Sequence, residues 1–450
     1  MAGRLLNRIE ASLRRMKIND YEVYMQIPEV TELYLRRGER ELVNEVRQVG
    51  YSVRVLERGL GMACCNQIDD RSVKRCLTQA RRMARQSKEE KLVFPTQKPT
   101  LKVDVKDQRI WNEPKNVVDE FQEELVEVAA KIGVELPFAK IRAFKIHSMI
   151  VNSEGLDREK EETYFFTEIC YKSSREGRLS EFWTTRYARR IEDVSLASIE
   201  RWAELSKANL YAKPPKTERL EVVLSPQVIC DLFVPVMNGH CTGLSLKQAI
   251  SRFEEGETVA DETLSIVDDG LHPFGIQSSP FDDEGNPQSR TVIIDHGVFK
   301  NRVYDQYYGL LYGKESTGNG LRQGMVSFLV DEKFKAVPRN QTSNLEIKSR
   351  EKSLEELISE IERGLLVYKF SWANPDEATG IFASEIRNAS LIEKGELAYP
   401  VKGGLIAGDI FSLMKNVTGI SNQSEIVSGE TAFSCITPWL RFKDVQVAGR

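Results

Sequence analysis

The first half of the chain changes from a helical to a strand-like pattern of apolar positions. Residues 3–17 carry an apolar stripe opposite arginine and glutamate, which is the period of an amphipathic helix and is formed by Leu5, Leu6, Ile9, Leu13 and Met16. From residue 21 to residue 65, short alternating runs are separated by glycines, which predicts a meander of antiparallel strands. A helix is predicted over 69–87, with Asp69 or Asp70 as its N-cap.

A second set of elements follows a connector rich in lysine and proline at residues 89–114. The pattern predicts helices over 115–133 and 195–208, with strands between them at 140–151, 163–171 and 181–188. Proline restricts the residue before it and donates no hydrogen bond. The segment Lys213-Pro-Pro-Lys216 is therefore predicted to be the main domain boundary.

Beyond this boundary the pattern is rich in strands and turns. Helices are expected at about 226–237, 353–363 and 408–415, and strands at 220–224, 263–267, 291–294, 327–330, 381–386 and 439–447. The predicted fold class is α+β, with N-terminal antiparallel sheets and helices followed by a strand-rich C-terminal domain. The predicted domains are residues 1–100, 101–213 and 216–450.

Composition and charge exclude several classes of partner. The 450 residues hold 63 Lys and Arg against 67 Asp and Glu, a net charge of −4, which gives no general attraction to nucleic acid or to anionic lipid. No apolar run has the length of a membrane helix, and no signal peptide is recognisable at the start. Seven scattered cysteines are typical of reduced thiols. We therefore expect a cytoplasmic protein with neither nucleic acid nor a membrane as its partner.

An ordered set of segments resembles the TldD/PmbA family. In the C-terminal half the segments are 221–226 followed by a helix, 264–269, 281–287, 297–305 and 316–322. Weaker N-terminal similarities are residues 50–55, 59–63 and 151–155. Each segment is short, but their order and spacing are similar to the family over nearly the whole chain.

The resemblance implies a member of the PmbA/TldE-like branch, which lacks the zinc motif. The TldD branch carries H-E-x-x-x-H on the helix after the boundary strand, together with a metal-binding cysteine near the C-terminus, and such a set implies a zinc peptidase. If His240 is taken as the second histidine, the first histidine is replaced by Pro235 and the glutamate by Val236. We expect no metal, no cofactor and no catalytic residue in this chain, and packing as the role of Cys435.

Two other segments have alternative interpretations. The resemblance implies that the loop of Ser316, Thr317, Gly318 and Asn319 lines a cleft and binds extended peptide through its backbone. The acidic run 282–284 precedes a Gly-Asn-Pro turn, and we expect its carboxylates to be solvated or to cap the turn. The neighbours His240 and Cys241 suggest a thiol nucleophile, but catalytic pairs usually come from different segments.

The sequence and the resemblance leave three candidate functions. The first is the subunit without metal in a TldD-type zinc metallopeptidase complex that cleaves unfolded peptides or modified-peptide precursors. Its partner would be a TldD-like zinc-bearing subunit or a second copy of this chain. The alternatives are a regulatory binding protein of the gyrase-modulator type and a stand-alone metal-independent hydrolase.

Overall fold

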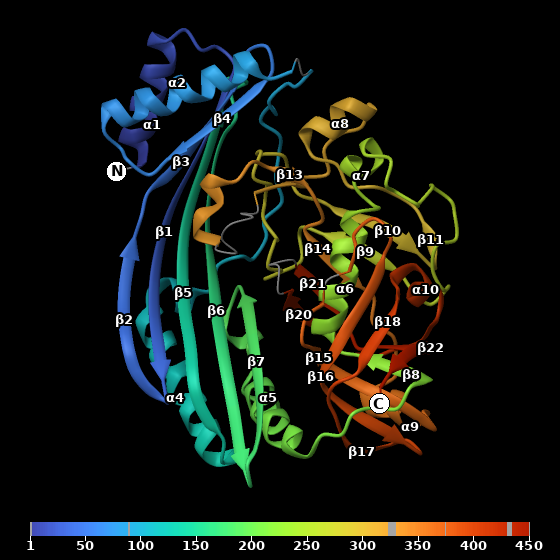
Figure 1. Ribbon diagram of the computed structural model, residues 1–450. Helices are drawn as coiled ribbons and strands as arrows, with labels where there is room; N and C mark the ends of the chain where they lie inside the picture. Colours follow the sequence, from blue (N-terminus) through green and yellow to red (C-terminus); the bar gives the residue numbers. More distant parts are fainter. Residues whose placement is uncertain (1, 89–90, 323–329, 374, 430–433, 450) are drawn as a thin grey trace.

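The N-terminal half is built on one antiparallel sheet. The computed structural model describes residues 2–88, 91–322, 330–373, 375–429 and 434–449. In the described part the sheet has seven strands in the order β4-β3-β1-β5-β6-β7, with β2 also paired to β1 (Figure 1). The strands are β1 (Tyr21–Arg36), β2 (Glu39–Arg47), β3 (Gly50–Leu56), β4 (Leu60–Cys65), β5 (Glu135–Asn152), β6 (Asp157–Arg175) and β7 (Arg178–Ala188).

Strand β1 is longer than the short runs that the sequence pattern predicts. Its first part, up to Gln26, pairs with β3, and its second part, from Glu29, pairs with β2 on the same edge. Pro28, which has no N–H to donate, lies where the partner changes. The predicted meander of antiparallel strands is therefore present, but two of the predicted strands are parts of a single one.

The sheet is buried on both faces except along β2, whose residues are mostly exposed. One face is covered by the helices α1 (Ala2–Arg15), α2 (Asp70–Gln86), α3 (Gln108–Asn112), α4 (Pro114–Ile132) and α5 (Leu196–Ala208). The other face packs on the C-terminal half. Successive residues of β5 show the division, because Ala143 joins the helix-side core while Phe144 packs in a cluster with Ile276. The predicted cap is also present, since the Asp69 side chain accepts the N–H of Ser72.

The predicted units 1–100 and 101–213 both contribute strands to this sheet. They have separate hydrophobic cores on its helix-covered face, one around α1 and α2 and the other around α4 and α5. The connector between them carries no regular element from residue 91 to residue 107. The two units are thus joined by a shared sheet. The domain bounds given above remain a prediction.

The C-terminal half contains two larger sheets with helix α6 in their common core. Ile229 and Phe233 of α6 belong to the same core as Val222 of one sheet and Ile266 of the other. The first sheet has the order β11-β10-β9-β14-β21-β20, and the second β15-β8-β22-β18-β16-β17 with β19 on β22. The strands are β8 (Glu218–Leu224), β9 (Ile266–Asp269), β10 (Arg290–Asp295), β11 (Val298–Phe299), β12 (Gly320–Leu321), β13 (Arg339–Asn340), β14 (Asn344–Ile347), β15 (Arg363–Phe370), β16 (Ile381–Glu393), β17 (Glu396–Val401), β18 (Leu405–Asp409), β19 (Val417–Ile420), β20 (Glu425–Ser428), β21 (Ser434–Thr437) and β22 (Leu440–Ala448).

The mixed α+β class and the strand-rich C-terminal half are confirmed, with two local differences. The predicted helix 353–363 is shorter in the structure and ends at Ser359. Arg363 is already the first residue of β15, which pairs in parallel with β8. Of the predicted strand 327–330, residues 327–329 lie outside the described residues, and Val330 begins a 3-10 helix. The C-terminal helices are α6 (Pro226–Asn238), α7 (Gly243–Lys247), α8 (Gln306–Tyr312), α9 (Leu354–Ser359) and α10 (Ile410–Lys415). Among the described residues, no helix combines the length and the apolar composition needed to cross a bilayer.

Candidate functional site

Helix α6 carries the positions at which the family's zinc motif is expected. Ser225 caps its first turn by accepting the N–H of Val228, and Pro226 occupies the first helical position, where no N–H is needed. Pro235 lies inside the helix and is buried, and the Val236 side chain is in the C-terminal core. The two positions therefore carry apolar groups that serve packing.

His240 follows α6 and is fully buried. Its Nδ1 accepts the backbone N–H of Arg252 at 2.9 Å, and its Nε2 lies 3.1 Å from the carbonyl oxygen of Glu377. An acceptor at Nδ1 and a donor at Nε2 define a neutral imidazole in one tautomer. Burial lowers the pKa of His240 to about 4, so the ring stays neutral at physiological pH.

These positions do not fit a zinc ion. Both nitrogens of His240 are engaged with backbone groups, and its ring packs against Phe253 and Phe411 at centroid distances of 5.4 and 4.8 Å. Among the described residues, no three or more His, Cys, Asp or Glu side chains are arranged to hold a metal. Cys435 is buried in β21, with α6 packed on that strand.

The loop predicted to bind peptide is folded into the C-terminal half. The Thr317 hydroxyl accepts the N–H of Tyr304, and Asn319 Nδ2 donates to Asp268 Oδ2 at 2.7 Å. Gly318 has φ +79°, and a Cβ there would lie 2.4 Å from the Gln288 Cα. Asn319 is buried, while Ser316 and Thr317 are partly exposed. The loop's polar side chains are thus committed to internal bonds.

A cleft of about 540 Å³ opens beside this loop, between β3 and β4 of the N-terminal sheet and α7 and α8 of the C-terminal half. Its aliphatic and aromatic lining residues are Leu60, Leu92, Leu244, Tyr307, Tyr308, Val337 and Pro338, and its polar ones are Arg54, Gln248, Glu284, Asp305, Arg339 and Asn340. The charged residues that are also buried, Arg54, Glu284 and Asp305, form its back. A concave site that combines apolar walls with convergent polar groups is the usual form of a binding site.

The charged back of the cleft joins the two halves of the molecule. Glu284 accepts Nη1 of Arg54 at 2.8 Å and the N–H of Gln306 at 3.0 Å. Asp305 caps α8 by accepting the N–H of Tyr308. Burial and the charge of Glu284 raise the pKa of Asp305 well above its usual range.

Behind the cleft lies a buried ion network that the sequence pattern does not reveal. Glu22 of β1 accepts bonds from both Arg54 of β3 and Arg322 of the segment after β12. Arg322 also donates its backbone N–H to Asp283 Oδ2. The only signal in the sequence is a charged residue inside each of two apolar strands.

The interpretation of the acidic run 282–284 as solvated is wrong, although its capping role is confirmed. Asp282, Asp283 and Glu284 are at most 3% exposed. Asp282 Oδ1 accepts the N–H groups of Glu284 and Asn286 within the turn. Its other oxygen accepts the N–H of Gly320, which ties the run to the loop of Ser316–Asn319.

Comparison with known proteins agrees with this architecture. The sequence profile of the PmbA/TldA metallopeptidase C-terminal domain matches residues 217–449, and that of PmbA/TldA metallopeptidase domain 1 matches residues 21–84. The first match covers just over half of the chain. The fold and these matches therefore define the same class of protein that the sequence segments of the C-terminal half resemble. The chain belongs to the PmbA/TldD family.

Individual relatives are distant. A metalloprotease of Methanocaldococcus jannaschii is 24% identical over 445 residues, which cover 94% of each chain. The crystal structure of TldE from Thermococcus kodakarensis has a TM-score of 0.87 at 22% identity, covering 98% of this chain and 100% of that one. A Thermotoga maritima structure described as a candidate modulator of a DNA gyrase has a TM-score of 0.84 at 22% identity, with both chains fully covered.

Other relatives align over less of their length. An uncharacterized protein of Methanocaldococcus jannaschii is 27% identical, with 64% of this chain and 65% of its own covered. A metalloprotease TldD homolog of Haemophilus influenzae is 29% identical, with 50% of this chain and 48% of its own covered. The chain therefore spans about half to two thirds of these two relatives.

Proposed function

We propose that this chain is the subunit without zinc in a TldD-type metallopeptidase complex, where it binds unfolded peptides or modified-peptide precursors. The observation that carries the proposal is His240, whose two ring nitrogens are both occupied by backbone groups. The neighbouring motif positions carry Pro235 and Val236, which offer no ligand. In this proposal the ion and the attacking water belong to a TldD-like partner, or the chain pairs with a second copy. Its seven free thiols are stable in the reducing cytoplasm, where we place it.

The peptide lies in the 540 Å³ cleft in this proposal. An extended chain would place apolar side chains against Leu244 and Val337 and its backbone against the polar back wall. In this proposal the loop of Ser316–Asn319 contributes indirectly, by supporting one wall of the cleft. The N–H of Gly320, next to the loop, donates to Asp282, and Glu284 of the same acidic run lines the cleft. This differs from the direct binding by the loop's own backbone that the resemblance implies.

Binding of a labelled unfolded peptide, followed by fluorescence anisotropy, tests this location. Val337 lies in the cleft and is 49% exposed, while Val43 on β2 lies outside it and is 48% exposed. Val337→Glu should weaken binding about tenfold, because a carboxylate would enter an apolar wall. The matched control Val43→Glu should bind normally. The reverse result would place the peptide on the β2 edge and refute the cleft.

The gyrase-modulator alternative rests on the descriptions of solved structures at 22% identity or less, the Thermotoga maritima protein among them. If the chain were a regulatory binding protein, its affinity for the target would not depend on whether its complexes have peptidase activity. The stand-alone hydrolase is disfavoured, because Cys241 is buried and burial strongly raises the pKa of its thiol.

A further inference from the structure

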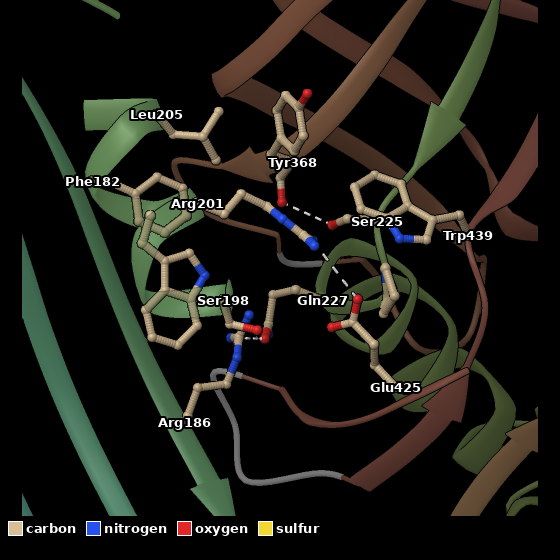
Figure 2. A pocket seen from close by; sticks show the side chains of 12 residues that line it. Phe182, Arg186, Ser198, Arg201, Leu205, Ser225, Gln227, Tyr368, Glu425 and Trp439 are labelled. Atoms are coloured by element: carbon tan, nitrogen blue, oxygen red, sulfur yellow. Dashed lines mark hydrogen bonds and ion pairs between the residues drawn. The ribbon is translucent and has the colours of Figure 1, made fainter. Parts of the chain in front are cut away.

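A second, smaller pocket lies where α5 of the N-terminal half meets the first turn of α6 (Figure 2). Its volume is about 40 Å³, which is room for roughly three water-sized groups. Phe182 and Trp202 form one wall, with their rings stacked 6.5 Å apart, and Trp439 forms the opposite one. The pocket therefore suits the end group of a ligand rather than a whole molecule.

Arg186 brings a guanidinium group into this pocket. Its Nη1 donates to the Thr184 hydroxyl, to the Thr185 carbonyl oxygen and to Gln227 Oε1. Among the described residues, no protein acceptor bonds its Nε or Nη2, and no carboxylate lies within ion-pair distance of Arg186. Burial lowers the pKa of this guanidinium, although the side chain is only partly buried, and its Cζ lies 5.2 Å from the centre of the Trp202 ring. Arg186 is thus a partly desolvated cation that packs on an aromatic ring and has no ion-paired carboxylate among the described residues.

Arg201 supplies a second guanidinium at the mouth of the pocket. Its ion pair with Glu425 is long, at 3.9 Å, and both side chains are more than two fifths exposed. Such a pair contributes little to stability. Figure 2 shows the Arg201 guanidinium extending across the pocket toward Glu425, so an incoming anion would compete with this carboxylate for the same group.

The start of α6 adds to the positive character of the site. Ser225, Pro226 and Gln227, the cap and first residues of this 13-residue helix, line the pocket. The N-terminal end of a helix carries a partial positive charge. A further acid, Asp231, lies one turn along α6 and accepts a bond from Gln227 Nε2 at 3.0 Å.

We propose that this pocket binds a carboxylate group, held between the guanidinium groups of Arg186 and Arg201. A planar carboxylate matches the fork of an arginine, and the apolar walls strengthen the interaction by excluding water. The C-terminal carboxylate of a peptide is the source that we assign, an assignment that rests on the proposed function.

Binding of acetate and of acetamide to the full chain, measured by calorimetry, tests the pocket. The two probes share a shape and differ in charge. Acetate should bind and acetamide should not. Arg186→Gln should weaken acetate binding about tenfold, and Glu425→Gln should tighten it, because the competing carboxylate is gone. Arg219→Gln, which removes an exposed arginine paired with Asp444, should leave it unchanged.

Equal binding of acetate and acetamide, or binding of neither, would overturn the pocket proposal. Preference for inorganic phosphate over acetate would also overturn it, since the chemistry would differ. Arg201→Gln provides a second variant at the exposed mouth if Arg186→Gln does not fold, and the same weakening is expected of it.

The peptide source is tested separately with N-acetyl-trialanine as the free acid and as the C-terminal amide. The acid should bind about tenfold more tightly, and Arg186→Gln should abolish the difference. Equal binding of acid and amide would refute a C-terminal carboxylate as the source while acetate binding stands. The cleft proposal has its own readout in Val337→Glu, so the two failures are distinguishable.

Discussion

His240 is the residue that separates the two interpretations of α6, as a metal-binding helix or as a core helix. The sequence alone placed a histidine near the zinc motif and showed that its companions were missing. It could not show that both ring nitrogens are bound to backbone groups of residues 252 and 377, which lie on separate segments. The structural role of the imidazole depends on those long-range contacts.

The lowered pKa of His240 predicts a specific dependence of stability on pH. The folded pKa is about 4 and the usual value is 6.5, so between these values the unfolded chain holds a proton that the folded chain lacks. The free energy of unfolding should therefore fall as pH falls from about 6.5 to 4, by at most about 3 kcal/mol from this group. Urea unfolding of wild type and His240→Gln at several pH values should show the slope reduced in the variant. The variant His296→Gln, at an exposed turn, should keep the wild-type slope.

Gly318 gives a second test at the scale of one residue. A Cβ would meet backbone atoms of Pro287 and Gln288 at 2.4 Å, on a residue with φ +79°. We expect Gly318→Ala to destabilise the protein by at least about 2 kcal/mol. Gly313 also has positive φ but open space around it, so Gly313→Ala should cost only about 1 kcal/mol. Similar losses in thermal unfolding would show that the loop is not tightly packed.

At the scale of elements, local patterns identified most helices and strands, because caps and periodicity are properties of neighbouring residues. The lengths of β1, β5 and β6 were underestimated, since these strands are buried on both faces and polar residues interrupt their apolar pattern. Glu22 of β1 and Arg54 of β3 are two buried charged residues within apolar strands. Their partners Arg322 and Glu284 are 300 and 230 positions away in sequence, and no local pattern connects them.

The buried network between β1, β3 and the C-terminal half makes a strong prediction. Glu22 is fully buried and holds two arginines. Replacing it by Gln leaves Arg322 without its carboxylate partner and Arg54 with Glu284 alone, so Glu22→Gln should lower the free energy of unfolding by about 3–5 kcal/mol. The exposed pair of Arg219 and Asp444 is the control, and Arg219→Gln should cost less than about 1 kcal/mol. Equal small losses in urea unfolding would mean that the network does not hold the halves together.

At the scale of the whole molecule, the two halves meet along one face of the N-terminal sheet and at its β7 edge, next to α5 (Figure 1). The larger cleft and the small arginine pocket both lie along this junction, each lined by residues from the two halves. The sequence predicted a boundary at 213–216 but could not place sites across it, because such sites exist only after the halves dock. A peptide bound at this junction would contact both halves at once.

The zinc content of the purified protein, measured by elemental analysis alone and in complex with a TldD-like partner, tests the central claim most directly. The account predicts no stoichiometric zinc on the isolated chain, because His240 is committed to backbone bonds and its motif companions are Pro235 and Val236. The complex should hold zinc only in proportion to the partner. One tightly bound zinc per isolated chain, lost on changing His240, would contradict the account.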